Sequence, residues 1–149
     1  MKTHKLLFIA SGVLWIIWGL VHILAGVMTM GKVLEEDITG AVAGIADKID
    51  PATLVANYPV ASGAVIGQHG FNLFWIGVVT TICGVFVFRG KKNAIYLAAI
   101  TGGLADLGYF LFMDLGGHIN FVPGTVMTLV SASAIVLSLV ALNQAKKAG

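Results

Sequence analysis

Four long apolar segments alternate with short polar stretches along this chain. They cover residues 6–28, 67–88, 93–113 and 121–143. A helix needs about 20 apolar residues to cross the hydrocarbon core of a bilayer, and each segment is close to that length. The pattern predicts an all-α membrane protein, a four-transmembrane-helix bundle that forms a single integral-membrane domain over residues 1–149.

The connection between the first two segments, residues 29–66, has a different pattern. Apolar residues recur in it at helical spacing with charged residues between them, and the apolar set is Val33, Leu34, Ile38, Val42, Ile45 and Ile49. Such an amphipathic pattern predicts short helices lying across the mouth of the bundle. Asp50 followed by Pro51 predicts that one of them starts there. The segment is expected to be a surface-lying linker, with a lid over a site or a docking surface as alternatives.

Composition excludes a soluble domain. The chain is 58% hydrophobic and 11% charged, whereas a soluble domain carries about 25% charged residues. A net charge of +2 gives no indication of a nucleic-acid partner, and a single cysteine, Cys83, excludes an intramolecular disulfide and a thiolate metal cluster. The uncharged run from Leu6 to Gly31 resembles a signal peptide but is long enough to span, so we expect it to be retained.

Basic residues predict the direction of the spans. Seven of the nine lie at the N-terminus, the C-terminus or the connection between the second and third spans: Lys2, Lys5, Arg89, Lys91, Lys92, Lys146 and Lys147. Only Lys32 and Lys48 fall on the opposite side. Because cytoplasmic loops are enriched in Lys and Arg, both termini are expected in the cytoplasm. The compact chain is expected in the bacterial cytoplasmic (inner) membrane, in contact with membrane lipids.

Small residues recur every seven positions within the spans. The three sets are Gly12, Gly19 and Gly26; Gly70, Gly77 and Gly84; and Gly124, Ser131 and Ser138. Small residues let membrane helices approach closely, so these faces are expected to pack against other helices. Trp15 and Trp18 are interpreted as packing residues in the same bundle.

Two ionisable residues interrupt the apolar pattern. His22 lies beside the glycine stripe of the first span, and Asp106 shares a small-residue face of the third. At about 1.5 Å per residue, they lie about 9 and 10 Å below the outer ends of their spans. A charge inside a bilayer costs several kcal/mol, so such residues usually have a partner or a function. We therefore predict an outward-facing intramembrane pocket containing both residues, with Asn72 and His69 as further ligand-binding candidates. The alternative is that His22 and Asp106 only hydrogen-bond each other and join two helices.

The pocket predicts a ligand but not its identity. A divalent transition metal would take His22, His69, Asp106 and His118 as ligands, because imidazole and carboxylate suit such ions, although no HxxxH spacing supports it. A quinone or lipid head group would use His22 and Asp106 as hydrogen-bonding partners. Haem is less favoured, because His22 and His69 differ in depth by about 6 Å.

Other functional classes stay open. The chain could be a non-catalytic structural or accessory subunit of a larger membrane complex, or self-associate through its glycine-rich faces, because two sides of the second span are expected to be packed. An enzyme with His22 as general base lacks a neighbouring nucleophile. A channel is disfavoured because the inner half offers only hydroxyl groups. The four-span layout is similar to that of the DoxX-like proteins; this similarity concerns topology and carries no residue motif.

Overall fold

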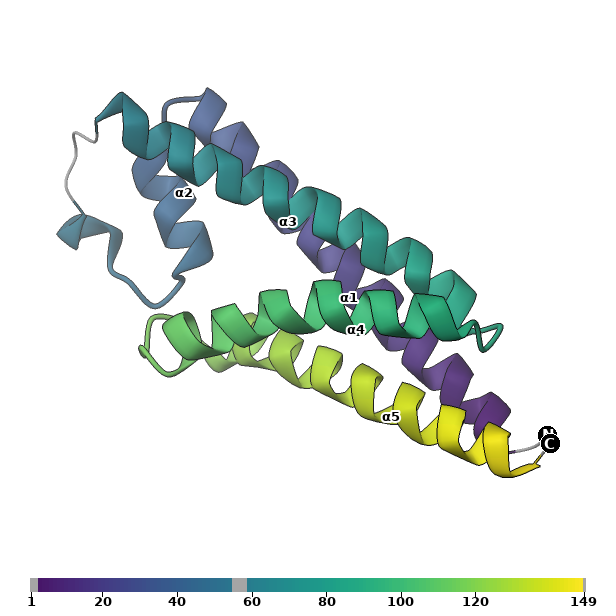
Figure 1. The fold of residues 1–149 in the computed structure, drawn as a ribbon. Helices are drawn as coiled ribbons and strands as arrows, with labels where there is room; N and C mark the ends of the chain where they lie inside the picture. The colour runs from purple at the N-terminus through teal and green to yellow at the C-terminus, as the bar shows by residue number, and fades with distance from the viewer. Residues whose placement is uncertain (1–2, 55–58, 149) are drawn as a thin grey trace.

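The chain folds into four long helices and a small helical cap, which consists of α2 (Ile38–Ile45) and η1 (Pro51–Thr53). The computed structural model describes residues 3–54 and 59–148, which contain no strand. The long helices are α1 (Thr3–Leu34), α3 (Val60–Val87), α4 (Lys92–Tyr109), which continues as η2 (Phe110–Asp114), and α5 (Val126–Ala148), which follows η3 (Phe121–Thr125). All four are long and apolar enough to cross a membrane. The predicted all-helical membrane protein with four apolar helices is confirmed (Figure 1).

The first two long helices extend beyond their predicted spans. α1 runs to Leu34 and α3 begins at Val60, so much of the predicted outer segment belongs to these helices. The reason is that α1 and α3 stay paired there: a Cβ atom on Gly67 would lie 3.4 Å from Val33. Only α2 (Ile38–Ile45) and η1 (Pro51–Thr53) remain as separate short helices.

Asp50 caps a helical turn at the position where the sequence predicted a helix start. Its side chain accepts a hydrogen bond from the Ala52 N–H at 2.9 Å, and Pro51 occupies the first helical position. The helix that follows is a single 3₁₀ turn, and the continuation of the segment at 55–58 lies outside the described residues.

Helices α1 and α3 pack through their glycine stripes. A Cβ atom on Gly19 would lie 2.6 Å from the Gly77 carbonyl oxygen, and Gly12 and Gly26 approach Gly84 and Gly70 as closely; the corresponding distances are 2.8 and 2.5 Å. Nothing larger than glycine fits between these backbones without moving them. The prediction of close packing along the two stripes is confirmed, and the stripes contact each other.

The second packed side of α3 is also filled within the chain. Thr80 is fully buried, and its methyl group would lie 3.2 Å from a Cβ atom on Gly102 of α4. The two packed sides therefore give no reason to expect a partner helix. An accessory role stays a prediction without that support.

Helix α5 is joined to α1 by hydroxyl groups in the half of the bundle where α1 begins and α5 ends. The Ser11 hydroxyl donates to the Ala134 carbonyl at 2.8 Å and also contacts the Ser138 hydroxyl. Trp15 and Trp18 of α1 are fully buried in the core beside these contacts. These contacts join α5 to α1, while the glycine stripes join α3 to α1.

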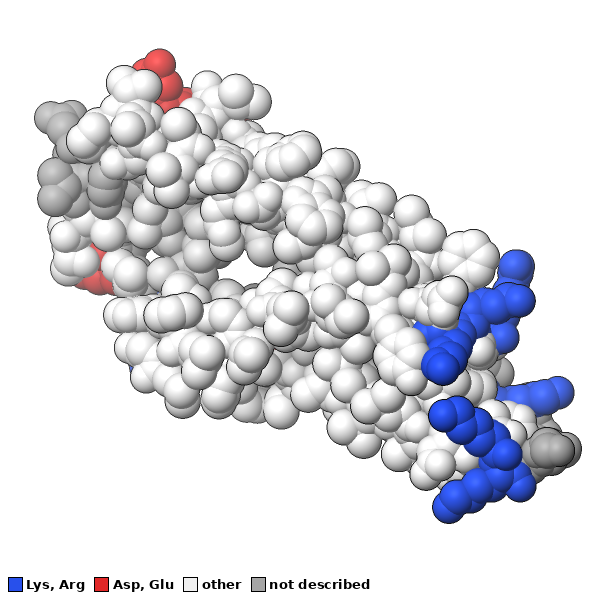
Figure 2. Space-filling view, viewed as in Figure 1, with Lys and Arg blue, Asp and Glu red and all other residues white. Residues whose placement is uncertain are grey.

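Charge is separated between the two ends of the bundle. Figure 2 shows Lys and Arg gathered at the end where α1 begins, α5 ends and α3 joins α4. Acidic side chains appear at the opposite end, beside the cap. This separation matches the pattern used to predict the orientation, while the compartments on the two sides stay a prediction.

Candidate functional site

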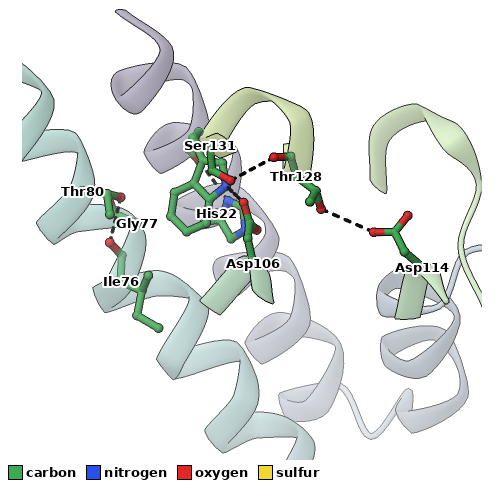
Figure 3. Close-up of polar contacts among 9 residues, drawn as sticks. His22, Ile76, Gly77, Thr80, Asp106, Asp114, Thr128 and Ser131 are labelled. Carbon is green, nitrogen blue, oxygen red and sulfur yellow. Dashed lines mark hydrogen bonds and ion pairs between the residues drawn. The ribbon is translucent and has the colours of Figure 1, made fainter. Parts of the chain in front are cut away.

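The buried carboxylate of the site is held by a tryptophan. Asp106 lies on the buried face of α4, one and two turns after Gly102 and Ala98, and is only 4% exposed. The Trp18 indole Nε1–H donates to its Oδ2 at 2.7 Å. Figure 3 shows Ser131 of α5 beside the Asp106 carboxylate. Trp18 is therefore more than the packing residue that the sequence indicated, since it joins α1 to α4 by a buried hydrogen bond.

His22 is oriented by the same tryptophan. Its ring lies one turn after Trp18 on α1 and stacks on the indole, with ring centroids 3.5 Å apart and an interplanar angle of 19°. The His22 Nδ1 atom donates to the Trp18 carbonyl oxygen at 2.8 Å, because a carbonyl can only accept. The remaining ring nitrogen, Nε2, points to Asp106 (Figure 3).

His22 and Asp106 face each other without a direct hydrogen bond. The distance between His22 Nε2 and Asp106 Oδ1 is 4.0 Å, beyond hydrogen-bonding range. The predicted proximity of the two residues is confirmed. The alternative, in which the two residues only hydrogen-bond each other, differs from the structure. Trp18 provides the hydrogen bond that joins α1 to α4.

A cavity of about 250 Å³ opens beside this pair. Its walls are mostly apolar and come from α1, α3, α4, α5 and the cap; they include Leu24, Met28, Leu73 and Met127. His22 and Asp106 line one part of it, and Ile45 of α2 lines another. Figure 2 shows the surface hollowed between α3 and α4 in the half that carries the cap. The cavity combines an apolar body with a small polar region.

Only one of the other predicted site residues lines the cavity. His69 lines the cavity from α3. Asn72 does not line it, and its side-chain oxygen accepts instead from the Trp75 indole N–H at 3.1 Å. His118 is exposed in the turn between α4 and α5, where its carbonyl oxygen accepts from the Lys48 N–H at 3.2 Å. Of the four predicted ligand-binding residues, the structure brings His22, Asp106 and His69 to one cavity.

The predicted metal ligands do not form a metal centre. Within residues 3–54 and 59–148, no group of three His, Cys, Asp or Glu side chains is arranged to hold a metal ion. Protein zinc sites use three or four such ligands. The arrangement of His22 and Asp106 instead suits an organic ligand that forms hydrogen bonds.

The cap is held over the cavity at both ends. Asp47, just after α2, accepts the Asn120 N–H at 2.7 Å, which ties the cap to the turn between α4 and α5. At the other end, Lys32 pairs with Asp37 at 2.9 Å, and Asp37 caps α2 by accepting the Gly40 N–H. The hydrogen bond from the Lys32 ammonium holds the pKa of Asp37 below its ordinary value. Both ends of α2 are thus fixed by polar contacts.

Two ionisable cavity residues were missed by sequence reasoning. Tyr109 lies one helical turn after Asp106 and lines the same cavity, a neighbour that the three-residue spacing could have identified. Lys32 also lines it, from near the end of α1. Its position was obscured because the predicted first span ended at residue 28.

Fold and cavity together define a small four-helix membrane protein with a lined internal space. No protein-family model, curated protein or solved structure matches this chain.

Proposed function

We propose that the protein binds a small lipid-soluble molecule with a polar head group in this cavity. The observation that carries the proposal is the combination of apolar walls with the facing pair His22 and Asp106. Ligand sites typically join apolar linings to a few polar groups that fix orientation. Quinones and lipid head groups are the ligand classes that the sequence first indicated for this pair.

The size of the cavity supports a small ligand. Pockets for organic ligands have volumes of roughly 300–1,000 Å³, and about 250 Å³ is just below that range. Leu24 and Met28 line the cavity and are also largely exposed, so the cavity reaches the lipid-facing surface of the bundle. Only the head group and a short part of the tail would be enclosed, while the rest extends into the bilayer.

The proposed orientation places this cavity in the outer leaflet of a bacterial cytoplasmic membrane. The basic end of the bundle would face the cytoplasm, because cytoplasmic segments are enriched in Lys and Arg. The cavity lies in the opposite half, beneath the cap. The ligand would then enter from the outer leaflet rather than from the cytoplasm.

Native mass spectrometry of the protein, extracted gently from its own membrane, tests the proposal. Wild-type protein and the control His4→Ala, which lies at the other end of α1, should carry the same additional mass. His22→Ala should lose it or carry much less, because it removes one polar group of the site. A wild-type chain without bound small molecules, or equal occupancy in both variants, would overturn the proposal.

A further inference from the structure

We infer that the head group bound by His22 and Asp106 is a primary ammonium group, an inference that rests on the proposed ligand-binding function. The pair offers two hydrogen-bond acceptors on one side of the cavity. Two features point to this group: the acceptor atoms that the two side chains leave free, and the negative charge of the carboxylate.

The hydrogen bonds of Trp18 determine which atoms remain free. His22 Nδ1–H is used by the Trp18 carbonyl, so the neutral imidazole keeps its lone pair on Nε2. Asp106 Oδ2 accepts the Trp18 indole N–H, and the Ser131 hydroxyl beside the carboxylate donates its hydrogen to the Thr128 carbonyl at 3.0 Å, which leaves Oδ1. Both remaining atoms, Nε2 and Oδ1, are acceptors, and they point to each other across 4.0 Å.

One nitrogen with two hydrogens can satisfy both acceptors. Two atoms 4.0 Å apart can each lie about 2.8–2.9 Å from a single donor placed to one side of the line between them. A hydroxyl group has one hydrogen and would satisfy only one of them. A quinone carbonyl or a phosphate oxygen would bring a third acceptor to the same point.

Charge favours an ammonium over an uncharged donor. The Asp106 carboxyl is 4% exposed and lies within a membrane span, where an uncompensated charge is costly. The lysine that lines the cavity, Lys32, is already paired with Asp37 at 2.9 Å. A ligand ammonium would supply the compensating charge and form charge-assisted hydrogen bonds, which are stronger than neutral ones.

The apolar walls determine what the ammonium is attached to. Leu24, Met28 and Met127 belong to the apolar part of the lining and carry no charge. The ligand is therefore an amphiphilic amine, either a free lipid-soluble amine or a lipid with an ethanolamine head group. These two sources share the same ammonium chemistry and are separated by the test below.

A matched ligand series tests the inference on the full chain in phosphatidylcholine nanodiscs. The probes are 4-phenylbutylamine, 4-phenylbutanol and trimethyl(4-phenylbutyl)ammonium, which share one tail; the alcohol lacks the charge and the quaternary ion lacks N–H donors. We expect the amine to bind about tenfold or more tightly than either analogue, as charge-assisted hydrogen bonds predict. In Asp106→Asn the amine should bind no better than the alcohol, and His22→Phe, which removes the Nε2 acceptor, should weaken the amine more than the alcohol.

The outcomes distinguish the inference from the proposed function. Equal binding of amine and alcohol, unchanged by Asp106→Asn, would overturn the ammonium inference while the cavity remains a ligand site. If no probe binds and no small molecule is carried from the native membrane, the proposed function fails as well. With the amine preference established, addition of phosphatidylethanolamine to the nanodiscs should lower amine affinity if the source is a lipid and leave it unchanged if the source is a free amine.

Discussion

At the residue scale, Trp18 contacts both polar residues of the site. Its indole N–H donates to Asp106, its carbonyl accepts from His22, and its ring stacks on the imidazole. His22 and Asp106 could be predicted from the sequence because ionisable residues are rare in membrane spans. The role of Trp18 could not be predicted, because a tryptophan in a membrane span fits a packing residue equally well. Only the fold places Asp106 beside its N–H.

Trp18→Phe should destabilise the protein more than Trp15→Phe. Both indoles are fully buried on α1, so both changes remove similar packing. Only Trp18 donates to a buried carboxylate, whereas the Trp15 N–H has no acceptor within residues 3–54 and 59–148. Loss of a partner for a buried group costs about 1–3 kcal/mol, and this should be the difference between the two free energies of unfolding in mixed micelles. Equal losses would contradict the role assigned to Trp18.

At the element scale, the α1–α3 pair is the closest helix contact in the bundle. The seven-residue repeats predicted that these faces pack, because the small-residue pattern is local and regular. The helix ends could not be predicted from hydropathy, because α1 and α3 continue to pair beyond the apolar core. The position of the cap could not be predicted either, since its hydrogen bond to Asn120 joins residues 73 positions apart.

Gly19→Ala should destabilise the α1–α3 pair by about 1–3 kcal/mol, as overpacking does. The added Cβ atom would lie 2.6 Å from the Gly77 carbonyl oxygen, so the helices must separate. Gly31→Ala in the same helix is the matched control, because nothing among the described residues beyond its own helix backbone lies within 4 Å of its Cβ position. Unfolding in mixed micelles measures both variants, and a Gly19→Ala protein as stable as the control would contradict the packing described.

Asp47→Ala should loosen the cap over the cavity. The change removes the acceptor for the Asn120 N–H, a bond whose loss costs about 1 kcal/mol. Amide hydrogens of α2 should then exchange faster, as measured by hydrogen exchange and mass spectrometry. Asp50→Ala serves as control, because Asp50 caps η1 and bonds only within its own segment. Unchanged exchange in α2 would show that the cap does not depend on Asp47.

At the scale of the whole molecule, the two ends of the bundle differ in charge. The sequence predicted this separation because each long helix reverses the direction of the chain, so the basic residues near both termini and in the α3–α4 connection lie at one end (Figure 2). The cavity could not be predicted from the same pattern. It depends on the spacing between α3 and α4, which Figure 1 shows diverging toward the cap.

Cysteine labelling tests the orientation of the whole chain. Cys83 is buried, and a Cys83→Ala background leaves single introduced cysteines as the only thiols. In intact cells with a permeable outer envelope, Glu36→Cys should react with a membrane-impermeant maleimide, whereas Lys147→Cys should react only after lysis. The reverse pattern would place the cavity in the cytoplasmic leaflet.

Methionine methyl groups give the most direct test of ligand binding in the cavity. Met28 and Met127 line it, whereas Met30 and Met113 do not. In methyl-labelled protein in nanodiscs, titration with 4-phenylbutylamine should shift the NMR signals of Met28 and Met127, with contacts between these methyls and the ligand, and leave Met30 and Met113 unchanged. Shifts confined to Met30 and Met113, equal shifts at all four, or no saturable shift would contradict a binding site beside His22 and Asp106.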